Sequence, residues 1–109
     1  MAKILYATLK TTAGRIVKIT NVTDTYLVLV SDESVICNKA TAFAVTLFPA
    51  VTATIGQKIT ISNINTGVVT ITADATGTAD LIDGVATQAI YQWETIQLEC
   101  NAADKWKII

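Results

Sequence analysis

The sequence predicts an all-β protein, folded as a single domain into an antiparallel β-sandwich or barrel of jelly-roll-like form. Short alternations of apolar and polar residues recur about every eight to twelve residues, separated by turn residues. The composition is rich in Val, Ile and Thr, with 51% hydrophobic and 16% charged residues, which is typical of β-sheets. No stretch of helical period is long enough for an α-helix, and 109 residues is an ordinary length for one domain.

The first strands follow from alternation in the N-terminal part. Residues 3–9 alternate weakly and predict an edge strand or an arm, which residues 11–14 interrupt and residues 15–20 resume. Residues 26–30 are apolar throughout, which predicts a strand covered on both faces and therefore a contact between subunits. Residues 34–38 are expected to pair with this strand as a hairpin.

The central stretch, Phe43–Gly84, predicts a second hairpin. Apolar and polar residues alternate over residues 58–62 and again over residues 69–72, and Asn63–Gly67 supplies turn residues between them. Asp83–Gly84 is a dipeptide typical of a tight turn, with apolar residues on either side. The sequence therefore predicts that the strands at the centre of the chain have one buried face and one face exposed to solvent.

The C-terminal part predicts three further strands and two turns. Strands are expected over residues 86–91, 95–100 and 105–109, with turns at Gln92–Glu94 and Asn101–Asp104. The chain closes on two isoleucines, and because chain ends normally fray, an apolar end suggests that it is tied into a sheet or a subunit interface.

The charges argue against several classes of partner. The net charge is −1 and the eight basic residues are scattered, so no nucleic-acid partner is expected. Lys10, Arg15 and Lys18 form the only loose basic group, whose simplest interpretation is a solvated face. No apolar run is long enough to cross a bilayer, so no membrane partner is expected. Residues 1–10 lack the apolar core of a signal peptide, and nothing marks the chain for export.

The residues that carry chemistry are sparse. Histidine is absent, which removes the commonest general base, so we expect neither an enzyme nor a cofactor. Cys37 and Cys100 lie on strand-like alternations and are predicted to be free, buried thiols rather than a disulfide or a metal site. Asp74, Asp80 and Asp83 are interpreted as turn residues in preference to a carboxylate pair or a calcium loop.

Aromatic side chains near the predicted turns have two interpretations. Tyr91 and Trp93 flank a turn, where rings can stack on a sugar or on a partner surface. In a chain with few aromatic residues, large rings also fill the core. Core or interface packing is favoured for Trp106, and both interpretations stay open for Trp93.

Six short motifs follow one another in the region from Tyr26 to the C-terminus. They are VTLFPA at Val45–Ala50, IGQKITISN at Ile55–Asn63, TGVVTI at Thr66–Ile71, LIDG at Leu81–Gly84, YQWETIQL at Tyr91–Leu98 and WKII at Trp106–Ile109. In this order they resemble the β-structured domains that end many bacteriophage tail fibres, head fibres and capsid decoration proteins. Two features depart from that pattern. Asn101–Asp104 replaces the usual Asp-Gly turn before the last Trp, and no fibre shaft precedes the matched region.

The resemblance implies a homotrimeric, intertwined virion structural protein of the decoration, cement or head-fibre type, without catalytic activity. A trimer also agrees with the low charge fraction, which leaves apolar surface to be covered by other subunits. In this interpretation residues 1–22 are an attachment arm or edge strand, and residues 23–109 form the β body. Lys10, Arg15 and Lys18 would contact the major capsid or tail protein on the virion surface, after synthesis in the host cytoplasm.

The alternative function is a receptor-binding or carbohydrate-binding module at the tip of a phage tail fibre. Trp93 and Tyr91 would then stack on a host surface glycan. The two functions use different parts of the chain, because attachment depends on the first 22 residues and stacking depends on a turn near the C-terminus.

Overall fold

The computed structural model describes residues 17–77 and 79–109. Within this part of the chain the structure is all-β, with ten strands and one short 3-10 helix, η1. The elements are β2 (Ile19–Val22), β3 (Tyr26–Leu27), β4 (Ser34–Cys37), β5 (Phe43–Thr46), η1 (Ala50–Thr52), β6 (Lys58–Asn63), β7 (Val69–Thr72), β8 (Leu81–Ile82), β9 (Thr87–Ile90), β10 (Thr95–Ala102) and β11 (Lys105–Ile108). β2 overlaps the strand expected over residues 15–20, whereas residues 3–9, where an edge strand or an arm is expected, lie outside the described residues.

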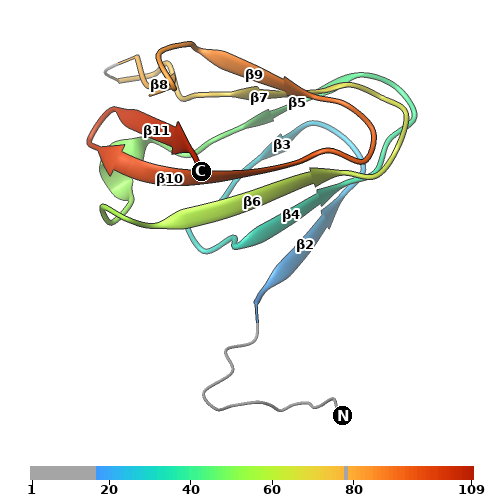
Figure 1. The fold of residues 1–109 in the computed structure, drawn as a ribbon, viewed down its shortest axis with the longest axis horizontal. Helices are drawn as coiled ribbons and strands as arrows, with labels where there is room; N and C mark the ends of the chain where they lie inside the picture. The colour runs from blue at the N-terminus through green and yellow to red at the C-terminus, as the bar shows by residue number, and fades with distance from the viewer. Residues whose placement is uncertain (1–16, 78) are drawn as a thin grey trace.

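The strands form two facing sheets (Figure 1). One sheet has six strands in the order β2-β4-β6-β10-β11-β8, and the other has four in the order β3-β5-β7-β9. Apolar side chains of alternate residues fill the space between the sheets, and Val35, Val45, Ile61, Ile71 and Leu98 are fully buried there. This arrangement follows from the period of two in the sequence, which gives each strand one apolar face.

Successive strands from β2 to β9 alternate between the two sheets. β2, β4 and β6 therefore lie parallel to one another in one sheet, and β3, β5 and β7 lie parallel in the other. Parallel neighbours need a long crossover connection. Here the strand in the opposite sheet supplies it, so the chain from β2 to β7 winds round the core as a coil.

The predicted antiparallel, jelly-roll-like pairing is therefore wrong. Five of the eight strand pairings among the described residues are parallel, and both sheets are mixed. The two predicted hairpins, residues 26–30 with 34–38 and residues 58–62 with 69–72, do not form, because the strands of each pair lie in different sheets. The physical reason is that alternation determines which face of a strand is buried but does not determine its neighbour.

Several local predictions are confirmed. Asp83 and Gly84 both have positive φ, at 47° and 84°, and the backbones of Ile82 and Val85 are hydrogen-bonded across the turn. Positive φ at both central positions is the requirement of a type I′ turn, which Asp-Gly meets readily. The C-terminal end is tied into the six-stranded sheet through β11 and through the N–H of Ile109, which donates to Gln97 O at 2.9 Å.

Trp106 packs in the core, as predicted. Its ring meets the ring of Phe48 edge-on, with centroids 5.3 Å apart and planes at 80°. It is buried, and its Nε1–H is the one buried side-chain nitrogen or oxygen without a hydrogen-bond partner in the described part of the chain. The contact anchors β11 to the segment that follows β5, so it fastens the C-terminal strand to the body.

Candidate functional site

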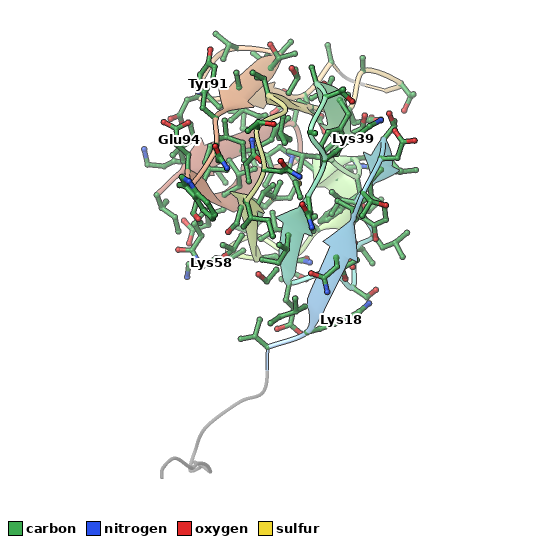
Figure 2. The ribbon with its side chains drawn as sticks, turned by 90° about the vertical axis from the view of Figure 1, so that its right-hand side faces the viewer. Lys18, Lys39, Lys58, Tyr91 and Glu94 are labelled. Atoms are coloured by element: carbon green, nitrogen blue, oxygen red, sulfur yellow. The ribbon has the colours of Figure 1, made fainter. Side chains whose placement is uncertain are left out.

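Four connections gather at one end of the sandwich, at the right of Figure 1. They link β2 to β3, β4 to β5, β6 to β7 and β9 to β10. Figure 2 views this loop end directly, with Tyr91 and Glu94 on one side and Lys39 on the other. Lys39 is already paired, because its Nζ lies 2.7 Å from Asp24 Oδ1, and this hydrogen bond lowers the pKa of Asp24.

Asn63 holds two of these connections together. It is buried at the end of β6, and its Nδ2 donates to Gly67 O at 2.8 Å and to Ile90 O at 3.1 Å. Its backbone accepts a hydrogen bond from the N–H of Trp93 at 2.7 Å. These bonds satisfy a buried amide and fix the connection after β6 against the connection after β9. The turn chemistry predicted for Asn63 is thus used to join loops, not to close a hairpin.

The turn between β9 and β10, at Tyr91–Glu94, presents two aromatic rings to solvent. The N–H of Glu94 donates to Tyr91 O at 3.0 Å, which closes the turn, and Glu94 Oε1 accepts from the N–H of Tyr91 at 2.7 Å. Trp93 has φ of 70° and is 75% exposed, and Tyr91 is 57% exposed. Glycine or asparagine normally occupies a turn position with positive φ, and a Trp there is an outlier. The turn predicted at Gln92–Glu94 is confirmed.

An open groove of about 500 Å³ lies beside this turn, where β9 of one sheet faces β10 and β11 of the other. We call it the inter-sheet groove. Its principal lining residues are Gln88, Ile90, Tyr91, Glu94, Ile96 and Ile108. Trp93 does not line it. The groove combines aliphatic side chains with the phenol ring of Tyr91, the amide of Gln88, the carboxylate of Glu94 and the hydroxyl of Thr95, and no basic residue of the described part of the chain lines it. Ligand sites commonly have this size and this mixture of apolar and polar groups.

The predicted site residues do not come together as one site. Tyr91 and Trp93 share a turn, as the stacking hypothesis requires. Lys10 and Arg15 lie outside the described residues. Lys18 is described, and Figure 2 shows it far from Tyr91 and Glu94. Its Nζ lies 3.5 Å from Ser31 Oγ and 3.6 Å from Asp32 Oδ1, so it has partners within its own fold.

A buried carboxylate, Asp32, organises the opposite end of the sandwich and was missed by the sequence analysis. It accepts hydrogen bonds from Tyr26 OH at 2.6 Å, Thr20 Oγ1 at 2.8 Å and the N–H of Leu29 at 2.9 Å. Burial acts to raise the pKa of Asp32, but these three bonds and Lys18 outweigh it and lower the pKa. Burial and the same carboxylate raise the pKa of Tyr26 to about 12. The cluster is fully bonded, which favours a structural role.

Cys37 and Cys100 are free and buried, as predicted. Burial raises the pKa of the Cys37 thiol to about 11 and also raises that of Cys100. Thiolates are the reactive form of cysteine, so neither thiol is suited to nucleophilic chemistry at neutral pH.

The three aspartates predicted as turn residues have separate structural partners. Asp80 accepts from the N–H of Ala50 at 2.8 Å, and Asp74 accepts from Thr76 Oγ1 at 2.9 Å. Asp83 Oδ1 accepts from the N–H of Ile108 at 3.3 Å. No group of three or more Cys, Asp or Glu side chains in residues 17–77 and 79–109 is placed to hold a metal ion.

Comparison with known proteins finds no match: no family model, no curated protein and no solved structure is significantly similar to this chain. Among the described residues, no helix has the length and apolar character needed to span a membrane. The functional argument therefore rests on the surfaces of the molecule and on the sequence motifs described above.

Proposed function

We propose that this chain is a non-enzymatic structural protein of a bacteriophage virion, of the decoration or cement type, that acts as a homotrimer on the virion surface. The observation that carries the proposal is an exposed aliphatic surface near the start of β2. It consists of Val17, Ile19, Leu29, Val30 and Ile55, each about half exposed or more. We call it the aliphatic surface.

The aliphatic surface spans three chain segments, which are the start of β2, the connection from β3 to β4 and the segment before β6. Hydrogen bonds hold these segments near one another. The N–H of Ser34, one residue after the connection from β3, donates to Lys18 O at 3.1 Å. Gln57 Nε2 donates to Val30 O at 2.8 Å, which joins the segment before β6 to the same connection. The segments that carry these five exposed side chains thus meet at one end of the six-stranded sheet, and a group of exposed aliphatic residues there suits contact with another protein.

The apolar stretch at residues 26–30 supports the same proposal. Only Val28 of its aliphatic side chains is buried, whereas Leu27, Leu29 and Val30 remain exposed in the single chain. The sequence predicts cover on both faces of this stretch. A neighbouring subunit would supply the missing cover, which is how the low charge fraction and the trimer are connected in this proposal.

The resemblance to phage fibre and decoration domains supplies the identity of the larger assembly. Its motifs coincide with elements that determine the fold, such as β6, the type I′ turn at Asp83–Gly84 and the strand that carries Trp106. Three attachment arms acting together would multiply a weak affinity for the virion. Residues 1–16, which include most of the proposed arm, lie outside the described residues.

Quantitative mass spectrometry of purified virions tests the virion role. A decoration protein would be present at a copy number comparable to that of the major capsid protein. A few copies per particle would indicate a fibre instead, and absence from virions would overturn the proposal.

Charge substitution on the aliphatic surface tests the trimer. Val30→Lys should dissociate it, because burying an unpaired ammonium at a subunit contact is costly. Val85→Lys is the matched control, since Val85 is 50% exposed against 49% for Val30 and lies beside β8, at the opposite edge of the six-stranded sheet. Light scattering at micromolar concentration reads out the mass. A stable wild-type monomer, or equal effects of both substitutions, would contradict the proposed contact.

Two deletions test the arm. Removal of residues 2–16 should leave a cooperatively folding trimer that no longer binds virions lacking the protein. Removal of residues 2–22 should also destabilise the body, because it takes away β2, whose Val22 is in the core. If the shorter deletion unfolds the protein or binds virions as the full chain does, residues 2–16 are not an attachment arm.

A further inference from the structure

The inter-sheet groove contains an amide whose hydrogen-bonding capacity is unused. Gln88 pairs with the buried Ile71 in the register between β7 and β9, so its side chain lies on the core-facing side of β9. Because β9 is an edge strand of its sheet, this side opens into the groove. The Gln88 side chain has no hydrogen-bond partner within residues 17–77 and 79–109. A glutamine amide offers two donors and one acceptor oxygen.

The turn at Tyr91–Glu94 supplies two further groups to the same groove. The Glu94 side chain is held in place by the hydrogen bond from the N–H of Tyr91 to its Oε1, and its other oxygen remains available. The ring of Tyr91 is more than half exposed. Figure 2 shows Tyr91 and Glu94 close to one another at the loop end. Ring, carboxylate and amide are therefore all present before any ligand binds, which lowers the cost of ordering them.

The chemistry of the lining limits the ligand. No Lys or Arg among residues 17–77 and 79–109 lines the groove, so phosphate, sulfate and acidic sugars would meet Glu94 with no neighbouring cation from this part of the chain. The isoleucines at positions 90, 96 and 108 favour an apolar face, whereas Gln88 and Glu94 require hydroxyl donors. A neutral pyranose ring has both, since one face carries C–H groups that pack on an aromatic ring and its rim carries hydroxyls.

From this geometry we propose that the inter-sheet groove binds a neutral saccharide built of hexopyranose units. One sugar ring lies against Tyr91, with its hydroxyls donating to Glu94 and exchanging hydrogen bonds with Gln88. This activity goes beyond the proposed virion role and does not depend on it, because the aliphatic surface and the groove share no residue. A surface protein with both would attach through one and hold a glycan through the other.

Titration of the full-length, ¹⁵N-labelled protein with neutral saccharides tests the proposal. The probes are oligosaccharides of glucose, galactose, mannose, N-acetylglucosamine and N-acetylgalactosamine, each added to millimolar concentration. At least one should shift the side-chain amide resonances of Gln88 and the backbone resonances of Tyr91 and Glu94. If no probe shifts them, the groove is not a saccharide site. If they shift with protein concentration alone, the groove is a contact between copies, which also overturns the proposal.

Substitutions locate the binding groups. Glu94→Gln preserves an acceptor for the N–H of Tyr91 and removes only the charge, so it should weaken binding about tenfold, as expected for the loss of about 1.4 kcal/mol. Tyr91→Ala should weaken binding by at least as much. Gln97→Ala is the control, since Gln97 is an exposed glutamine of β10 outside the groove, and it should leave the affinity unchanged. Equal affinity in wild type, Glu94→Gln and Tyr91→Ala would refute the assignment. Dispersed amide spectra confirm that each variant is folded.

Discussion

Asp32→Asn should destabilise the protein at neutral pH, because Asp32 is the acceptor that joins β2, β3 and the connection to β4. The substitution keeps the shape of the side chain and removes its charge. An amide can still accept from Tyr26 OH and from the N–H of Leu29 at one position, but its NH₂ group then faces Thr20 and the cation of Lys18. The buried group keeps its bonds only in weaker form.

The expected loss is about 3 kcal/mol. A hydrogen bond to a charged group contributes about 1.5–3 kcal/mol and a neutral one about 1 kcal/mol, so each bond that loses the charge loses about 1 kcal/mol. In Asp32→Asn the three hydrogen bonds from Tyr26, Thr20 and Leu29 lose either the charge of their acceptor or the acceptor itself. The ion pair to Lys18 adds little, because the Lys18 side chain is half exposed and solvent screens it.

The loss should depend on pH in a defined direction. The folded-state pKa of Asp32 lies below its ordinary value, so the charged form stabilises the fold above the ordinary pKa, and this stability disappears as the pH falls through the folded value. Asparagine does not titrate. The difference in unfolding free energy between wild type and Asp32→Asn should therefore be largest at neutral pH and shrink below about pH 4.

Urea unfolding at several pH values, at one protein concentration, measures this difference. Tyr26→Phe completes a double-mutant cycle, in which the combined loss should be smaller than the sum of the two single losses. A difference below about 0.5 kcal/mol at neutral pH, within the range of ordinary surface substitutions, would refute the reasoning. A difference in unfolding free energy that stays constant down to low pH would show that it does not come from the charge of the Asp32 carboxylate.

Two further predictions concern the thiols and one glycine. A thiol reagent should not react with Cys37 or Cys100 in the folded protein at neutral pH and should find two groups after denaturation, since both are buried with raised pKa; reaction at native rates would contradict their burial. Gly67→Ala should lower the melting temperature sharply, because a methyl group there would overlap the backbone of Thr41, whereas Gly77→Ala meets nothing within 4 Å and should be nearly neutral. Similar melting curves for both variants would contradict that close approach.

The sequence predicted the faces of the strands better than their partners. In β6, Ile59 and Ile61 are buried, whereas Lys58 is exposed and Thr60 is only partly buried, as the alternation of the sequence predicts. The turns at Asp83–Gly84 and Tyr91–Glu94 also follow from local chemistry. Which strands become neighbours depends on the sheet to which each connection leads. The sequence of a loop, such as the one after Asn63, has no alternation from which that sheet could be predicted.

The candidate site was predictable only in part for the same reason. The exposure of Tyr91 and Trp93 follows from a turn that the sequence indicates. In the sequence, Gln88 is indistinguishable from any other strand residue. That its amide is accessible to a ligand follows only from the topology, which places β9 at an edge of its sheet. The Asp32 cluster joins residues from three elements, so nothing in the local sequence around Asp32 distinguishes it from a turn aspartate.

The winding of the chain between two sheets has a consequence for how the protein is made. β10, at eight residues the longest of the described strands, lies between β6 and β11 in the sheet and is synthesised long after β6. Until it emerges from the ribosome, β6 has one open edge, and β7 likewise waits for β9. Among the described strand pairs only β10–β11 is joined by a short turn, and pairings between residues distant in sequence are slow to form. Incomplete chains therefore expose edges prone to aggregation, and stable folding begins only after translation reaches the C-terminal hairpin.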